Sequence, residues 1–166
     1  MLMAAGKLQF QARTLSLLVA LVCWFTFTES FGQQQRPDLS GTWKLNLKAS
    51  KLAPAHPRET DACQIKHAEP LIEVRCSFHG RNELYSYMTD GKERIANISA
   101  DGTIRAKTYW DGETLVIEKR QDRGDTAWVS RYRLSQDAKV LELTQHITKS
   151  AVRSPFDESL YYDKQP

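Results

Sequence analysis

Two cysteines in the C-terminal four-fifths of the chain, Cys63 and Cys76, carry its clearest potential for chemistry. The segments that contain them, 62–67 and 71–78, both read as strands, and Pro70 marks a turn midway between the two cysteines. If these segments form a hairpin about that turn, the cysteines lie directly opposite each other, where a disulfide can form. The sequence therefore predicts a Cys63–Cys76 disulfide, with a pair of reduced, buried thiols as the alternative.

Four histidines are the candidate ligands for a metal or a haem iron: His56, His67, His79 and His146. No two of them have the close spacing that is typical of zinc ligands, so the sequence predicts no metal site. A single proximal histidine, His67 or His146, could hold a haem, but no second feature of the sequence supports haem binding. No cofactor is therefore predicted.

The sequence contains none of the short motifs that place a catalytic nucleophile, a phosphate-binding loop or an acid–base pair of carboxylates. Three aspartates, Asp90, Asp101 and Asp111, recur about ten residues apart, and each precedes a glycine. Asp-Gly pairs supply the positive φ angles that two-residue hairpin turns need, so turn formation accounts for all three. We therefore predict a protein without catalytic residues.

The N-terminal segment has the features of a secretory signal peptide. Basic residues precede an uninterrupted apolar run, 15–27, and small and polar residues follow it. The run is shorter than the roughly 20 residues of a membrane-spanning helix, so no permanent membrane anchor is predicted. We expect cleavage after Gly32, or alternatively after Ser30. The signal peptide is then 1–32, and the single mature domain, 33–166, is secreted or periplasmic.

The charge of the chain points to no particular partner. Its 23 lysines and arginines nearly balance its 20 aspartates and glutamates, and the basic residues are scattered along the chain. Proteins that bind nucleic acids concentrate basic residues on one face or in one run, so no nucleic-acid partner is predicted. The predicted mature part is long enough to bury one hydrophobic core without further support.

Regular turn signals divide the predicted mature domain into about ten short segments rich in β-branched and aromatic residues. The expected strands are 41–47, 62–67, 71–78, 83–89, 93–98, 103–110, 113–120, 126–134, 140–147 and 159–163. Short links between successive strands favour an up-and-down barrel over a Greek-key sandwich, which needs long crossings between sheets. We therefore predict an all-β fold, an antiparallel meander that closes into a barrel.

The turns also predict which side chains face the interior. Folding at Asp111-Gly112 pairs Thr108 with Leu115, and folding at 135–139 pairs Tyr132 with Leu143. Folding at Asp90-Gly91 turns five further side chains inward: Leu84, Ser86, Met88, Ile95 and Asn97. The predicted ligand-binding residues are Trp128, Tyr132, Leu115, Ile117, Leu143, Asn97 and Ser86. A ligand would place its apolar body on Trp128 and its polar end toward Asn97 or Ser86.

The first predicted strand contains Gly41, Thr42 and Trp43 and resembles the Gly-x-Trp opening of lipocalins and related calycin barrels. It is more similar still to the GTWKL start of small exported bacterial proteins called lipocalin-like, whose final hairpins the segment 126–144 also resembles. The resemblance implies a barrel of about eight to ten strands. It also implies closure of one end by Trp43, often with an arginine of a late strand above it, here Arg131 or Arg133.

Two functions of different classes fit this barrel. The first is non-catalytic binding of a small, largely apolar molecule in the interior, which the polar residues among the inward set favour. The second is a structural or protein-interaction barrel filled by its own side chains, which the even spread of surface charge favours. Ligand binding is the leading hypothesis, with a small hydrophobic molecule as the partner.

Overall fold

The computed structural model describes residues 36–52, 62–78, 81–100, 102–123, 125–149 and 155–166. The predicted signal peptide and its cleavage site lie outside these residues. The ten strands are β1 (Gly41–Leu45), β2 (Ala62–Ala68), β3 (Leu71–Phe78), β4 (Arg81–Met88), β5 (Glu93–Ser99), β6 (Gly102–Asp111), β7 (Thr114–Gln121), β8 (Thr126–Leu134), β9 (Val140–Lys149) and β10 (Phe156–Lys164). Each of them overlaps one of the predicted segments.

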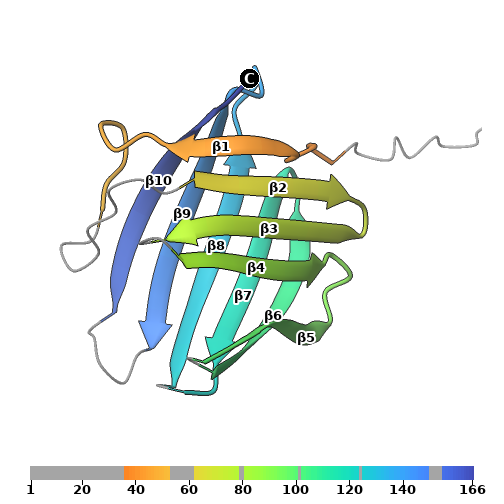
Figure 1. The fold of residues 1–166 in the computed structure, drawn as a ribbon. Coiled ribbons are helices and arrows are strands. Elements are labelled where there is room, and N and C mark those ends of the chain that lie inside the picture. Colours follow the sequence, from red (N-terminus) through yellow and green to blue (C-terminus); the bar gives the residue numbers. More distant parts are fainter. Residues whose placement is uncertain (1–35, 53–61, 79–80, 101, 124, 150–154) are drawn as a thin grey trace, which may run out of the picture. The chain divides into compact units, whose positions relative to one another are not determined.

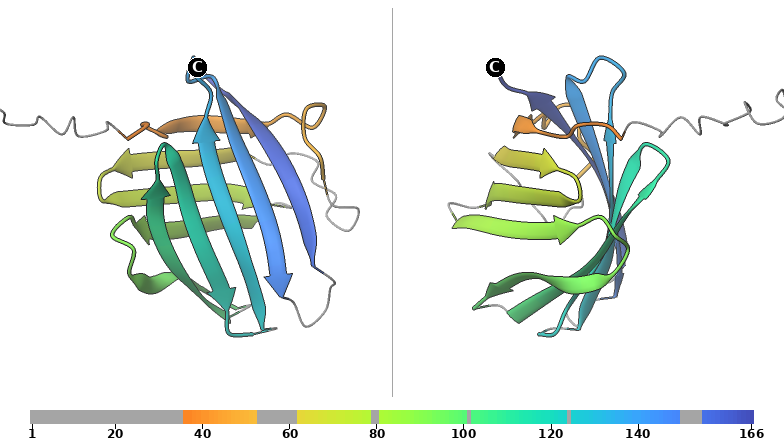
Figure 2. Two further views of the ribbon diagram at one scale, coloured as in Figure 1. Left: turned by 180° about the vertical axis from the view of Figure 1, so that it is seen from behind. Right: turned by 90° about the vertical axis from the view of Figure 1, so that its right-hand side faces the viewer.

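The strands form one antiparallel sheet in the order β4-β3-β2-β1-β10-β9-β8-β7-β6-β5. Strands that follow each other along the chain pair with each other, except β4 and β5, which share no ladder, and β1 also pairs with β10. Strands β1 to β4 form one wall and cross the strands of the other wall at a steep angle (Figures 1 and 2). The predicted all-β meander is therefore confirmed, as a nearly closed barrel that opens between β4 and β5.

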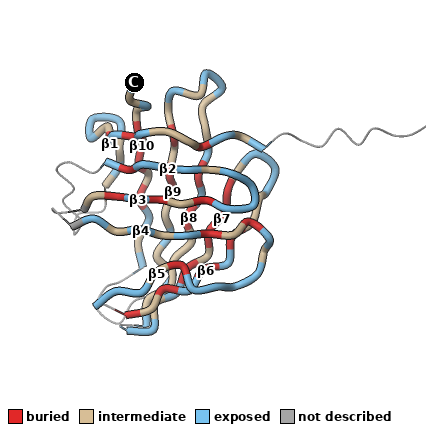
Figure 3. The backbone as a smooth tube through the Cα atoms, turned by 45° about the vertical axis from the view of Figure 1, so that its right-hand side comes forward, coloured by how far each residue is buried: buried red, intermediate tan, exposed pale blue. Residues whose placement is uncertain are grey.

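Burial alternates along the strands, as the wall of a barrel requires (Figure 3). On β6, Ala106 and Thr108 are buried, whereas Arg105 and Lys107 are exposed. The predicted pairing across the turn at 135–139 is confirmed, because Tyr132 lies opposite Leu143 in the ladder of β8 and β9. The inner faces of the two walls together form the hydrophobic core.

The turn between β6 and β7 lies one residue later than predicted. Asp111 pairs with Thr114, so the loop begins at Gly112, whose φ of 59° suits the first central position of a type II′ turn. Thr108 therefore lies opposite Ile117 and not Leu115. A shift of two residues keeps every side chain on its predicted face, because side chains along a strand alternate with a period of two.

The predicted hairpin at Asp90-Gly91 does not form, because β4 and β5 are the two end strands of the sheet. Gly91 still has the positive φ of a turn, 73°, but its N–H donates to the carbonyl of Thr108 on β6 at 2.9 Å. Asp90 forms a surface ion pair with Arg94, and hydrogen bonds from Arg94 lower the pKa of Asp90 to about 2. The segment is therefore a corner between the two walls.

The side chains that this hairpin was predicted to turn inward are largely on the outer face. Tyr85 and Tyr87 point inward, because the ladder with β3 places Tyr87 opposite the fully buried Ile72. Four residues predicted to face inward lie on the outer face: Leu84, Ser86, Met88 and Ile95. Asn97 does lie opposite the buried Ile104, because a β-bulge after Ile95 shifts its register.

Trp43 lies on β1, at the end of the barrel that we call the closed end, because the resemblance predicts that Trp43 closes it. Its side chain is fully buried, and its indole Nε1–H donates to the carbonyl of Leu39 at 3.0 Å. The cation near its ring is Lys164 of β10, whose Nζ lies 5.2 Å from the ring centroid. The expected arginines, Arg131 and Arg133, are exposed, because they alternate with the inward residues of β8.

The predicted disulfide is confirmed. Cys63 and Cys76 lie directly opposite each other in the ladder of β2 and β3 and are bonded. Both residues are buried on the inner face of the barrel.

Candidate functional site in the barrel interior

The registers of β6 to β10 align their inward side chains in rows that run across the wall. One such row, which we call the apolar row, contains Leu115, Tyr132, Leu143 and Leu160; Trp110 of β6 lies opposite Leu115, and a shorter row of Leu134, Leu141 and Tyr162 lies nearer the closed end. All four residues of the apolar row are at most 8% exposed. This part of the wall offers apolar contacts deep in the barrel.

The next row contains most of the polar side chains of this wall. This polar row consists of Thr108, Ile117, Ser130, Gln145 and Glu158. Thr108 and Ser130 are almost fully buried and Glu158 is only 3% exposed. The amide Nε2 of Gln145 donates to the hydroxyl of Ser130 at 3.1 Å, so neighbouring members of the row bond to each other.

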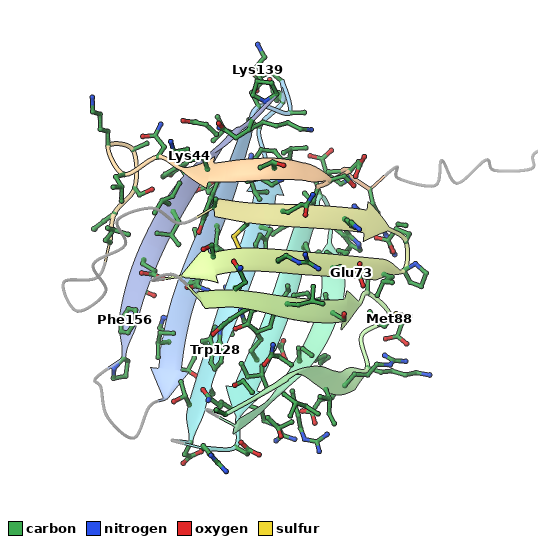
Figure 4. The ribbon with its side chains drawn as sticks, in the orientation of Figure 1. Lys44, Glu73, Met88, Trp128, Lys139 and Phe156 are labelled. Atoms are coloured by element: carbon green, nitrogen blue, oxygen red, sulfur yellow. A yellow bond between two sulfur atoms is a disulfide. The ribbon has the colours of Figure 1, made fainter. Side chains whose placement is uncertain are left out.

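A third row lies farther from the closed end. This lysine row consists of Ala106, Lys119, Trp128, Ile147 and Phe156. Lys119 is 9% exposed, and its Nζ lies 5.1 Å from the ring centroid of Trp128, a cation–π contact. Trp128 and Phe156 lie toward the end of the barrel opposite Lys139 (Figure 4) and are half-buried. The lysine row is therefore less buried than the apolar and polar rows.

The wall brings together five of the seven predicted ligand-binding residues. Leu115, Tyr132 and Leu143 are neighbours in the apolar row, Ile117 belongs to the polar row, and Trp128 belongs to the lysine row. Their common inward face follows from the turns between β6 and β7 and between β8 and β9. The second turn lies where the sequence predicted it, and the first lies one residue later, which leaves the side chains on their predicted face.

The other two predicted residues, Ser86 and Asn97, lie elsewhere. Both line a solvent-open groove of about 630 Å³ between β4 and β5. The amide Nδ2 of Asn97 spans this opening and donates to the carbonyl of Leu84 at 2.7 Å. Ser86 is exposed on the outer face, so the structure does not place it against Trp128 as expected.

The opposite wall contributes two stacked tyrosines that the sequence reasoning did not place inside. The rings of Tyr85 and Tyr87 have centroids 6.1 Å apart and are nearly parallel. Burial raises the pKa of Tyr87 well above its usual value, and the fields of Tyr132, Tyr85 and Glu83 raise it further. Tyr87 and Tyr132, on opposite walls, belong to the same hydrophobic core.

Lys119 and Glu158 are two charged inward residues that the sequence reasoning missed. A signal for Lys119 was present, because it continues the alternation of Leu115 and Ile117 along one strand. Glu158 is in phase with Leu160 and Tyr162, but the predicted strand began only at Ser159. Charged side chains are rarely fully buried in proteins, so both residues are candidates for a functional role.

At the closed end, Glu69 accepts hydrogen bonds from four side chains. The donors are Arg36 Nη1 at 2.8 Å, Thr89 Oγ1 at 2.5 Å, Trp110 Nε1 at 2.6 Å and His67 Nε2 at 3.1 Å. His67 Nδ1 in turn accepts the backbone N–H of Leu39 at 3.3 Å. This cluster, which we call the Glu69 clasp, fixes the segment before β1 to the hairpin of β2 and β3.

The Glu69 clasp predicts a pH dependence of stability. Partial burial tends to raise the pKa of Glu69, but hydrogen bonds from Thr89, His67 and Trp110 and the charge of Arg36 outweigh it and lower the pKa. A lowered folded-state pKa contributes stability that is present above the usual value of 4.5 and is lost as the pH falls through the folded-state pKa. The stability advantage of the wild type over Glu69→Gln should therefore shrink as the pH is lowered from neutrality into this range.

Urea unfolding of both proteins, followed by circular dichroism from neutral to acidic pH, measures this difference. Glu113→Gln removes the same charge from an exposed turn, and at neutral pH it should change the free energy of unfolding by less than about 0.5 kcal/mol. An advantage of the wild type that stayed constant or grew on acidification would contradict the assignment to Glu69.

Among the residues that the structure describes, no group of three or more histidine, cysteine, aspartate or glutamate side chains could hold a metal ion. In the same part of the chain, no helix is long and apolar enough to cross a membrane.

No protein-family model matches the sequence, and the search of curated proteins found no match. Solved structures do match the fold. An SAHS protein from Ramazzottius varieornatus has 13% identity and a TM-score of 0.61, over 78% of this chain and 97% of that chain. The REP1-NXSQ fatty acid transporter has 13% identity and a TM-score of 0.58, over 77% and 96%.

Caenorhabditis elegans lipid binding protein 8 is also similar, with 12% identity and a TM-score of 0.54, over 76% of this chain and 94% of that chain. At such low identities the likeness concerns the fold and leaves the ligand open. The chain therefore has a lipocalin-like, calycin-type barrel fold, as the resemblance of its first strand implied.

Proposed function

We propose that this chain is a non-catalytic binding protein that holds a small, largely apolar molecule inside its barrel. The observation that carries the proposal is the wall on which an apolar row adjoins a buried polar row. Buried polar groups are unfavourable unless they are hydrogen-bonded, so a barrel filled only by its own side chains gains nothing from such a row. Ligand sites, by contrast, combine apolar walls with a few well-placed polar groups.

The printed names of the similar structures support this proposal. They include a fatty acid transporter and a lipid binding protein, which are binding or transport proteins and not enzymes. Export is part of the proposal and is supported by the predicted signal peptide, 1–32, and by the Cys63–Cys76 disulfide. Disulfides persist in oxidising compartments, so the mature protein would act outside the cell or in a periplasm.

The ligand would lie along the wall of β7 to β9. Its apolar part would contact Leu115, Tyr132 and Leu143 of the apolar row, which are buried, and Ile117 beside them. The half-buried Trp128 would contact the part of the ligand nearest the solvent. This direction follows from the lower burial of the lysine row, and it replaces the predicted direction toward Ser86.

Titration of the mature protein with fatty acids, quinones and isoprenoids tests the proposal, with intrinsic tryptophan fluorescence as the signal and calorimetry as the measure of affinity. We expect saturable binding of at least one class, and a fluorescence change that is lost in Trp128→Phe. Truncation in Trp128→Ala should weaken binding about tenfold, which corresponds to about 1.4 kcal/mol.

Tyr109→Ala is the matched control for Trp128→Ala, because Tyr109 lies on the outer face of β6, where its hydroxyl donates to Glu118. It should retain both the binding and the fluorescence change. If no class binds while circular dichroism shows an intact fold, the barrel is a structural or interaction module filled by its own side chains.

A further inference from the structure

Glu158 is a buried acidic group that the proposed function leaves without a role. It is 3% exposed, and on β10 it alternates with the exposed Asp157 and the half-buried Ser159. The ladder with β9 places it opposite Gln145, which bonds to Ser130 on β8. A carboxyl, an amide and a hydroxyl from three adjacent strands therefore lie side by side on the inner face.

The chemistry of this trio favours particular ligand groups. A carboxyl oxygen and an amide oxygen both accept hydrogen bonds, and a hydroxyl can accept or donate. A ligand carboxylate at this level would lie beside a second acidic group in a site that excludes water. Two such groups cannot both ionise at low cost, so one of them would have to take up a proton.

We propose that the ligand carries a hydroxyl or amino group that donates to the polar row at Glu158, and that its head group is not a carboxylate. This inference rests on the proposed function and specifies the chemical class of the ligand. The apolar chain or ring of the ligand then lies on the apolar row, one level deeper. A long-chain alcohol or amine fits this order of apolar and polar contacts, whereas a fatty acid does not.

Lys119 offers the opposite preference, because an ammonium group attracts a carboxylate. It lies one row farther from the closed end, on β7, and its charge rests against the Trp128 ring. The strand order places β8 and β9 between Lys119 and Glu158, so the two charges are on separate parts of the wall. Carboxylate binding at Lys119 is therefore the competing outcome of the test.

Three probes with the same chain, 1-dodecanol, dodecylamine and dodecanoic acid, separate the alternatives when their affinities are measured by calorimetry at neutral pH. We expect the alcohol and the amine to bind at least about tenfold more tightly than the acid. This ranking in the wild-type protein does not depend on any variant. Equal affinities would overturn the proposal, as would tighter binding of the acid.

Glu158→Gln keeps the size of the side chain and removes its charge, so it should reduce the preference for the amine over the acid about tenfold or more. Asp157→Asn makes the same change at the adjacent residue, on the outer face, and should leave the preference within about twofold. Unchanged preference in Glu158→Gln, with the fold intact, would overturn the role of Glu158. Tight acid binding that Lys119→Met abolishes would assign the head group to Lys119 instead.

Failure of this inference is distinguishable from failure of the proposed function. If all three probes bind and the acid binds best, the barrel is a ligand carrier and only the class of the head group is wrong. If neither these probes nor the wider panel bind to the folded protein, the proposed function itself fails.

Discussion

Replacement of Trp43 by alanine is expected to lower the free energy of unfolding by about 3–5 kcal/mol, the largest effect of any substitution considered for this chain. The side chain is fully buried in the hydrophobic core, so its truncation leaves a cavity there. The substitution also leaves the carbonyl of Leu39 without the indole donor that lies 3.0 Å away. Urea unfolding followed by circular dichroism measures the change.

Two further variants separate the contributions at this site. Trp43→Phe keeps an aromatic ring but removes the hydrogen bond to Leu39, and it should cost less than Trp43→Ala. Leu47→Ala truncates a side chain that is 43% exposed just beyond β1, and it should cost less than about 0.5 kcal/mol. A loss below about 1 kcal/mol in Trp43→Ala would contradict a large packing contribution of Trp43 to the core.

The wall of β7 to β9 could be predicted from the sequence because local turns determine it. The turn at 135–139 fixes the pairing of Tyr132 with Leu143, and no distant part of the chain is needed. Even the misplaced turn at Gly112 left Leu115 and Ile117 on their predicted face. The residue opposite each position of β6 differs from the predicted one by two, and side chains along a strand alternate with a period of two. Predicted facings were therefore accurate where the predicted hairpin forms, and wrong at Asp90-Gly91, where it does not.

The wall of β2 to β4 could be predicted less well, because its phase depends on more than one turn. The Asp-Gly pair at Asp90 has the residues of a hairpin, yet the strands on either side of it end the sheet. Where a barrel opens is decided by the packing of both walls, and no local motif marks the position. The disulfide indicates the facing of this wall better than the turn does. Cys76 faces inward, so Val74, two residues before it on β3, also faces inward, and so does Tyr85, which lies opposite Val74 on β4.

The charged residues of the interior were missed for a different reason. Sequence patterns assign charged residues to the solvent face, and this rule holds for most positions. Glu158 and Lys119 violate it while remaining in phase with apolar neighbours such as Leu160. Positions where local expectation and observed burial disagree are often functional, and this disagreement is the basis of the proposed polar head-group site.

Loss of the Cys63–Cys76 disulfide should have the second-largest effect on stability. The bridge constrains the unfolded chain, and the chain-entropy argument gives about 2–4 kcal/mol for typical loops. The two cysteines are separated by 13 positions, so the short closed loop places the expected loss toward the lower end of that range. In the double variant Cys63→Ala/Cys76→Ala, the free energy of unfolding in urea should fall by this amount.

Reduction of the wild-type protein provides the control for this variant, because it breaks the bond without changing the packing residues. The reductant should lower the stability of the wild type toward that of the double variant and leave the double variant unchanged. Thiol titration of the denatured mature domain, 33–166, should detect no free cysteine before reduction and both cysteines after it. Free thiols before reduction, or equal stability of the oxidised wild type and the variant, would refute a stabilising bridge between β2 and β3.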